Sequence, residues 1–396
     1  MKKRMKSLLS IVAILIFFSI TTNSISANNI SISFEEEVDD FDTLINNLME
    51  MGKIPSLSTC IIKNDTIVWA KSYGYQNIYL RRKSTNDTIY PIGSVSKSIT
   101  ATAVMQLYEK GLIDLDEDVS NYLGFNLRNP KYPEVPITFR LLLSHQSGIT
   151  NCYMKYSIFT YLPDPFMLLE KFLTPGNLFY YSDAWSDFEP GQDVCYSTTG
   201  FDILSYLVEI VSGQSFNDYC KENIFHPLEM YNTSCYYSDF NKEKLSYSYK
   251  TLINIYLPMP RLNTRIFGGG GIKTNVIDLG HFLIAHMNNG TYKESQILNE
   301  TSISLMHQIH EPTYEDIPFG FGWHYWKDLD DTFFGGHGGT FSNTRTEMRT
   351  LGDIGVIYIW NYDIYEESDE HKQFLAEFVP LQIQKALFEK ADGLYI

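Results

Sequence analysis

Three short groups of residues in this chain have the types and spacing needed for nucleophilic catalysis. Ser94 and Lys97 form its only S-x-x-K pattern, and Tyr196 and the segment His337-Gly338-Gly339 follow later in the chain. On a helix, side chains three positions apart share one face, so the Lys97 ammonium can reach the Ser94 hydroxyl. A serine hydroxyl is a weak nucleophile until a neighbouring group activates it. These residues therefore predict a serine nucleophile with a lysine partner.

Each of these residues also has a plainer interpretation. A serine at the start of a helix commonly caps it, and a lysine on a helix is commonly solvated. Any one of the chain's 28 tyrosines can be a packing residue, and His337 can be a strand histidine held by a structural hydrogen bond. A single short motif carries a real risk of a false match. The chemistry therefore depends on whether the chain folds so that the three groups meet.

Strand patterns occur at both ends of the chain, with helical patterns between them. Residues 57–62 and 66–70 are β-type runs joined by a turn at 63–65, which is typical of a hairpin. A helix is expected to start near Ser94 and to end at Gly111. Further helices are expected from 201 to 213 and from 277 to 287.

The C-terminal region returns to strand character. Strands are expected at 319–323, 332–336, 344–348 and 354–360, followed by an amphipathic helix over 370–388. The chain would thus leave a sheet, build helices and then rejoin the sheet. Its 396 residues exceed the usual single-core limit of about 250–300 residues, so two lobes are expected.

The first residues have the layout of a secretory signal. Basic residues at 2–6 precede a mostly apolar stretch at 8–20 and small residues at 24–27. We expect a signal peptide over 1–27 and a secreted or extracytoplasmic protein, anchored if the signal stays uncleaved. The remainder, 28–396, is expected to be one bilobal unit. Its α/β lobe would comprise about 40–100 and 315–396, and its helical lobe about 101–314.

Charge and cysteine content narrow the classes of partner. The formal net charge is −16, which disfavours binding to nucleic acid or to an anionic membrane surface. The chain has five cysteines but no C-x-x-C pair, so a zinc site of that type has no support. His281 with His286, and His307 with His310, lack an accompanying ligand set. We therefore expect no metal and no cofactor, and a small molecule or a peptide as the substrate.

The order and spacing of these motifs resemble the serine β-lactamase and penicillin-binding protein superfamily. The closest resemblance is to its β-lactamase-related branch, which includes class C β-lactamases, D-alanyl-D-alanine carboxypeptidases and some esterases. Further similar blocks extend the resemblance from about residue 54 to 362; they are the segments 111–119, 141–149, 269–274 and 278–279. The resemblance implies an α/β (α+β) fold of the β-lactamase/transpeptidase type. An antiparallel sheet flanked by helices would pack beside an all-helical lobe.

The resemblance also implies roles for the residues. Ser94 would be the nucleophile, Lys97 and Tyr196 would share its proton, and His337 would polarise the site or bind a carboxylate. Which of Lys97 and Tyr196 removes the proton stays open, because coupled groups titrate as a unit.

The strand that carries His337 would face Ser94 and complete the site. Gly338 and Gly339 would let a substrate approach this strand closely. The amides of Ser94 and Thr340 would form the oxyanion hole. Arg345 on the next strand is a candidate for binding a substrate carboxylate, although a surface ion pair is the more ordinary role for an arginine.

One residue departs from the family pattern. The second motif usually ends in asparagine, and Thr198 stands there instead, with one hydroxyl in place of an amide. Most β-lactamases of the superfamily also have lysine where this chain has His337. Both differences favour an esterase or a D-Ala-D-Ala carboxypeptidase-like peptidase over a dedicated β-lactamase. The alternatives are a catalytically silent binding protein and a sensor that deacylates slowly.

Overall fold

The computed structural model describes residues 41–150, 169–252, 255–261, 267–311, 318–327, 333–362 and 370–394. All of them belong to one compact unit, Phe41–Ile396. The predicted signal peptide at 1–27 and Cys152 lie outside the described residues. No helix in the described ranges is long and apolar enough to span a bilayer.

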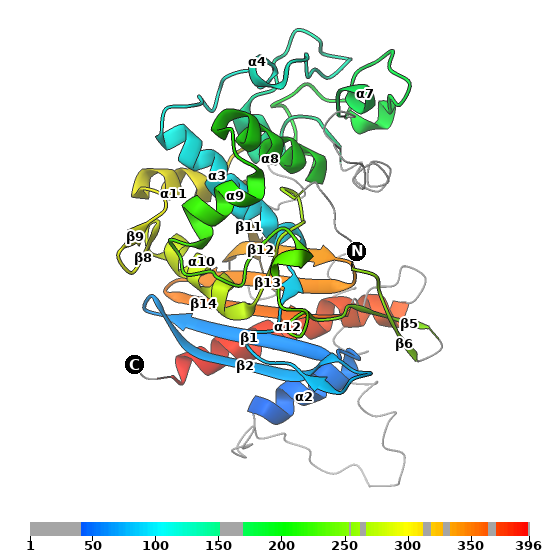
Figure 1. Ribbon diagram of the computed structural model, residues 1–396, viewed down its shortest axis with the longest axis vertical. Coiled ribbons are helices and arrows are strands. Elements are labelled where there is room, and N and C mark those ends of the chain that lie inside the picture. Colours follow the sequence, from blue (N-terminus) through cyan, green and yellow to red (C-terminus); the bar gives the residue numbers. More distant parts are fainter. Residues whose placement is uncertain are drawn as a thin grey trace, which may run out of the picture. The chain divides into compact units, whose positions relative to one another are not determined.

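The central element is an antiparallel sheet in the order β10-β11-β12-β13-β14-β1-β2-β3 (Figure 1). Its N-terminal strands pair with its C-terminal strands through β1 and β14, as the strand patterns at the two ends of the chain predict. The strands are β1 (Ser56–Lys63), β2 (Thr66–Asn77), β3 (Arg82–Lys83), β10 (Phe319–Gly320), β11 (Trp323–Lys327), β12 (Phe333–Phe341), β13 (Thr344–Leu351) and β14 (Ile354–Trp360).

Three further pairs of short strands lie outside the sheet. They are β4 (Tyr90–Pro91) with β7 (Lys273–Thr274), β5 (Tyr249–Leu252) with β6 (Ile255–Pro258), and β8 (Thr291–Tyr292) with β9 (Ser295–Gln296). The β4–β7 pair holds the residues just before Ser94 against a segment about 180 residues later in the chain.

The α-helices are α2 (Phe41–Met51), α3 (Ser96–Glu109), α4 (Ser120–Leu123), α5 (Phe139–Leu143), α7 (Leu169–Leu173), α8 (Thr198–Ser212), α9 (Phe216–Cys220), α10 (Val276–Met287), α11 (Glu300–His307) and α12 (Glu370–Asp392). Short turns of other helix types occur at η1 (Gly93–Val95), η4 (Ser182–Ala184), η5 (Lys221–Phe225) and η6 (Tyr237–Asp239). The predicted helices at 201–213, 277–287 and 370–388 correspond to α8, α10 and α12.

Strand β14 shows why the sheet needs helices on both faces. Every residue from 355 to 360 is buried, and successive side chains of a strand point to opposite faces. Tyr358 and Trp360 lie in one core with Val379 of α12. Ile357 and Ile359 lie in the other core with residues of α10. A continuous apolar strand is thus buried between two helical layers.

Helix α10 packs against the sheet, although the predicted lobe boundaries assign it to the helical lobe. It lies in the range 101–314 expected for the helical lobe, yet it packs directly against β1, β2 and β14. Gly280 of α10 permits this contact, since a Cβ there would lie 2.9 Å from Cδ1 of Ile67. The helical range therefore supplies one layer of the sheet as well as the helices around α3 and α8.

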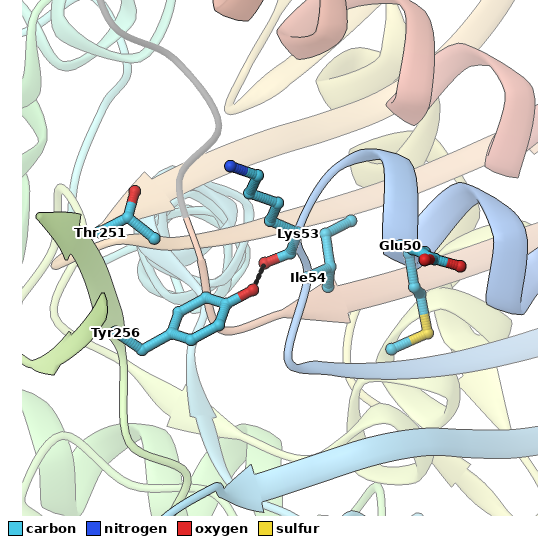
Figure 2. A pocket seen from close by; sticks show the side chains of 6 residues that line it. Glu50, Lys53, Ile54, Thr251 and Tyr256 are labelled. Atoms are coloured by element: carbon cyan, nitrogen blue, oxygen red, sulfur yellow. Dashed lines mark hydrogen bonds between the residues drawn. The ribbon is translucent and has the colours of Figure 1, made fainter. Parts of the chain in front are cut away.

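A hollow of about 570 Å³ lies beside the end of α2 (Figure 2). It is lined by residues from the end of α2, the turn between α2 and β1, and the β5–β6 hairpin. Tyr256 lies on one side and donates a hydrogen bond to the carbonyl oxygen of Lys53 (2.8 Å). None of the residues predicted for chemistry lines this hollow. The residues predicted for chemistry lie instead where β12 meets the turn before α3.

Acidification is expected to destabilise the fold through a histidine pair, the buried His286 and the half-buried His307. Nδ1 of His286 lies 3.2 Å from Nε2 of His307, and burial lowers the pKa of His307 from 6.5 to about 4. Because the folded pKa lies below the unfolded one, the unfolded state binds more protons between these values. The free energy of unfolding should therefore fall as the pH falls from about 6.5 toward 4.

Urea unfolding at pH 7 and pH 5 measures this effect. Replacing His307 with phenylalanine, which keeps an aromatic ring against Trp323, should remove about 2 kcal/mol of the loss between the two pH values. His226→Gln, at an exposed position, is the control and should keep the wild-type loss. Equal losses in all three proteins would contradict this prediction.

Candidate active site

Ser94 lies in the tight turn η1, directly before α3. Gly93 has a positive φ of 52°, and glycine adopts such angles with little strain. The turn leaves Ser94 partly accessible, while Lys97 on the first turn of α3 is fully buried. Nζ of Lys97 donates a hydrogen bond to Oγ of Ser94 at 3.0 Å. The structure therefore forms the contact that the three-residue spacing predicts.

The ammonium of Lys97 is held by two hydroxyl groups and a backbone carbonyl, and not by a carboxylate. Its Nζ also donates to the carbonyl oxygen of Gly269 (2.6 Å) and to Oγ1 of Thr198 (3.3 Å). No ion pair to Lys97 occurs among the residues that the structure describes. A buried charge is costly unless hydrogen bonds satisfy it, and three acceptors from separate segments do so here.

Thr198 stands where an asparagine is expected, and it still contacts Lys97. Its hydroxyl accepts from Lys97, and Gly269 makes room for its methyl group. A Cβ on Gly269 would lie only 2.4 Å from Cγ2 of Thr198. The side chain at 198 and the glycine at 269 therefore fit each other sterically.

Tyr196 comes to the same place from the segment before α8. The centre of its ring lies 4.9 Å from Nζ of Lys97 and 4.5 Å from the centre of the His145 ring. Nδ1 of His145 accepts a hydrogen bond from the backbone N–H of Ser197 (3.0 Å), and this contact fixes the segment that carries Tyr196. Within the described ranges, no hydrogen bond joins the Tyr196 hydroxyl to Ser94 or Lys97.

Strand β12 approaches the Ser94 turn with almost no space between the two backbones. A Cβ on Gly339 would lie 2.1 Å from the carbonyl oxygen of Ile92 and 2.8 Å from the backbone nitrogen of Ser94. A Cβ on Gly93 would lie 2.6 Å from the backbone nitrogen of Thr340. These two contacts bring the amides predicted for the oxyanion hole to the same junction.

His337 lies on β12 and is buried and neutral. Its Nδ1 lies 2.6 Å from the carbonyl oxygen of Gly338. A carbonyl only accepts, so Nδ1 carries the hydrogen and Nε2 presents a lone pair. Burial, followed by the Lys97 charge, lowers the pKa of His337 well below its usual value. This environment disfavours the protonated form that would bind a carboxylate.

His324 is a neighbour of the site that the sequence analysis did not single out. It lies on β11 with its ring centre 4.0 Å from that of His337. It is buried, and burial lowers its pKa well below 6.5. Its position opposite Gly336 in the β11–β12 ladder could be found only by knowing the register of strands that the chain separates.

The structure does not bring Arg345 to Ser94. Its Nε donates to Oε1 of Glu347 (3.0 Å), and NH1 donates to the carbonyl oxygen of Ala376 in α12 (3.1 Å). Arg349 pairs with the same Glu347. These alternate residues of β13 face α12, whereas Met348 between them lies in the core shared with α10. Arg345 therefore lies on the opposite face of the sheet from the Ser94 cluster.

The two remaining candidate residues lie on β12. Gly338 is partly accessible and Thr340 is exposed, and the backbone of Thr340 adjoins Gly93 in the turn that carries Ser94. Among the described residues, no group of three or more His, Cys, Asp or Glu side chains is arranged to hold a metal ion.

Comparison with known proteins identifies the family. A family model described as Beta-lactamase matches residues 41–379, so this chain belongs to the beta-lactamase family. Its fold is similar to that of the octameric penicillin-binding protein homologue from Pyrococcus abyssi, with a TM-score of 0.74, 25% identity, and coverage of 90% of this chain and 78% of that one. The predicted superfamily and the predicted fold class are confirmed.

Two curated relatives show the extent of the likeness. Protein flp of Staphylococcus aureus (strain MW2) is 25% identical over 303 residues, which are 76% of this chain and 58% of that protein. Penicillin-binding protein 4* of Bacillus subtilis (strain 168) is 25% identical over 326 residues, which are 78% of this chain and 67% of that protein. The matched region thus spans less than two thirds of Protein flp.

The contact between β12 and the Ser94 turn yields a testable prediction. Gly339→Ala should force the two backbones apart, because its Cβ would overlap the carbonyl of Ile92. We expect a lower Tm and at least a tenfold slower reaction of Ser94 with a fluorophosphonate, followed by intact mass. Gly270→Ala is the matched control, since its Cβ would meet nothing nearer than 3.7 Å. A Gly339→Ala protein that behaves like the control would contradict the packing argument.

Proposed function

We propose that this chain is a serine hydrolase that is acylated on Ser94 and then deacylated by water, with a small ester or amide as its substrate. The observation that carries the proposal is the 3.0 Å contact between a buried lysine Nζ and a partly accessible serine Oγ. Membership of the beta-lactamase family supports it.

The proposed reaction has two steps. Oγ of Ser94 bonds to the substrate carbonyl carbon, its proton passes to the Lys97–Tyr196 unit, and that proton leaves with the alcohol or amine as the acyl bond breaks. Water then attacks the acyl-enzyme, giving one proton back to Ser94 and leaving the carboxylic acid as product. Lys97 contacts Ser94 directly, and Tyr196 adjoins Lys97, so the two groups act as a coupled pair.

The β12 junction would stabilise the developing negative charge. The backbone amides of Ser94 and Thr340 are the proposed donors to the oxyanion, and such donors typically contribute about 10²–10³-fold in kcat. Neutral His337 would lie beside this junction, where its Nε2 could accept a hydrogen bond.

The charges near Ser94 favour a neutral substrate. Lys97 is the cation that contacts Ser94, and three oxygen atoms already occupy it. His337 is held neutral, and Arg345 faces α12. We therefore place esters ahead of the carboxylate-bearing alternatives, which are β-lactams and peptides ending in D-Ala-D-Ala.

Hydrolysis of p-nitrophenyl acetate tests the proposal. The wild-type protein should release p-nitrophenol, and Ser94→Ala should lose at least 10³-fold in kcat/KM, because it removes the atom that is acylated. Ser212→Ala, at the end of α8, is the control and should keep the wild-type rate. Equal rates in wild type and Ser94→Ala would reject the nucleophile. A burst of one equivalent without turnover would instead indicate the slowly deacylating sensor.

Two substitutions, one of Lys97 and one of its neighbour Thr198, should lower kcat by different amounts. Lys97→Met removes the amine that contacts Ser94 and is coupled to Tyr196 in the proposed proton transfer, and should lower kcat by about 10²–10⁴-fold. Thr198→Val keeps the shape but loses one of three acceptors, so we expect a loss of about three- to tenfold. Steady-state kinetics of both variants would measure these losses. A Thr198→Val loss as large as that of Lys97→Met would contradict the idea that Gly269 and Ser94 hold the ammonium.

A further inference from the structure

His324 is a buried residue beside the site to which none of the roles above gives a task. It lies on β11 and is 8% exposed. Its Nε2 is buried with no hydrogen-bond partner among the described residues. What this side chain offers to its neighbours is therefore the packing surface of its ring.

The His324 ring contacts two residues of the proposed machinery, Tyr196 and His337. Its centre lies 4.0 Å from that of His337, with the ring planes tilted by 40°. It lies 5.7 Å from the centre of the Tyr196 ring, with the planes at 83°, which is the edge-to-face arrangement that aromatic pairs favour. One side chain from β11 thus touches a ring from the segment before α8 and a ring from β12.

The orientations of Tyr196 and His337 depend on such packing. Within the described ranges, no hydrogen bond joins the Tyr196 hydroxyl to the Ser94–Lys97 pair, so contacts of the ring set where this hydroxyl points. His337 donates from Nδ1 to the carbonyl oxygen of the next residue (2.6 Å), whereas its Nε2 is buried without a partner in the described part of the chain. Each ring is therefore held in part by its contact with His324.

Surrounding rings hold His324 itself in place. Its ring centre lies 4.4 Å from that of Phe319, 5.1 Å from that of Trp326 and 6.3 Å from that of His145. A side chain that its own neighbours lock can hold a functional group within the small tolerance that catalysis needs. His324 has the fixed position that a supporting residue requires.

We propose that His324 is a positioning residue: its ring keeps Tyr196 beside Lys97 and keeps His337 in the tautomer that is protonated on Nδ1. The inference rests on the proposed function only for the statement that Tyr196 and His337 serve the reaction at Ser94. The tautomer of His337 is a property of the folded protein, and it can be observed without any substrate.

An NMR experiment on protein labelled with ¹⁵N-histidine tests this inference. The chain has nine histidines, and the His337 signals are assigned by their loss in His337→Gln. In the wild-type protein we expect Nδ1 of His337 to carry the hydrogen and Nε2 to be unprotonated. In His324→Ala the freed His337 ring should sample both neutral tautomers, so the shifts of its two nitrogens should move toward each other.

Ester hydrolysis gives a second readout. His324→Ala should lower kcat for p-nitrophenyl acetate by about 10²-fold and change KM by less than about threefold, because misplaced groups slow the reaction more than they weaken binding of a small ester. His324→Phe keeps an aromatic ring at this position without the ring nitrogens. It should therefore restore kcat to within about fivefold of wild type.

His281→Ala is the matched control. His281 is another imidazole packed on an aromatic ring, with its centre 4.6 Å from that of Tyr292, but it lies on α10 and packs on β8. Its replacement should leave the His337 signals and kcat unchanged. Thermal unfolding shows whether each variant is folded, and His324→Leu is the replacement if His324→Ala is not.

The outcomes separate this inference from the proposed function. Unchanged His337 signals in folded His324→Ala would overturn the inference, even if hydrolysis depends on Ser94. A His324→Phe protein that loses as much kcat as His324→Ala would also overturn it, because ring packing would then not be the contribution of His324. Hydrolysis that does not depend on Ser94, together with the expected change in the His337 signals, would reject the proposed function and leave the inference standing.

Discussion

The site depends on keeping the ammonium of Lys97 inside the protein without a paired carboxylate. Moving a charge from water to a protein interior costs several kcal/mol unless polar groups replace the lost hydration. Here the replacements are Oγ of Ser94, Oγ1 of Thr198 and the carbonyl oxygen of Gly269. Each comes from a different part of the chain. The charge is therefore stable only when the turn before α3, the start of α8 and the glycine segment before β7 are assembled.

The same requirement explains the glycines around Ser94. Gly93 and Gly339 let the Ser94 turn and strand β12 meet backbone to backbone, and Gly269 leaves room for Thr198. A side chain at any of these positions would separate the segments that surround Lys97 and Ser94. Dense packing of this kind transmits small displacements, because interiors contain few voids that could absorb them. The glycines thus allow the close backbone contacts that surround the Lys97 ammonium, and the same lack of side chains suits the proposed approach of a substrate to β12.

Thr198 illustrates how a departure from a family pattern can be accommodated. A threonine has fewer hydrogen-bonding atoms than an asparagine, yet its hydroxyl reaches Lys97. Its methyl group fills space that a side chain at 269 would otherwise occupy. The substitution therefore preserves the contact to the lysine and changes what the site offers to a substrate. This agrees with the proposed preference for small esters over substrates that need an amide contact.

Much of the fold and the centre of the site could be predicted from the sequence, because they depend on local periodicity. The spacing of Ser94 and Lys97 places them together through helix geometry alone. The strand patterns located β1, β13 and β14 closely, but for β2 they located only the start, since the predicted run at 66–70 extends to Asn77. The bounds of β12 were less well predicted: the expected strand at 332–336 extends to Phe341. Its glycines have weak strand propensity, and pairing with β13 outweighs it.

Tertiary structure alone decided which distant groups meet and which charges they carry. Gly269 reaches Lys97 from 172 residues away, and no local pattern encodes that contact. Arg345 faces α12 because strand alternation and register assign it to that side. His337 is neutral because burial favours its uncharged form. Residue types and their order thus determined the chemistry available, while long-range packing decided desolvation and therefore the charges.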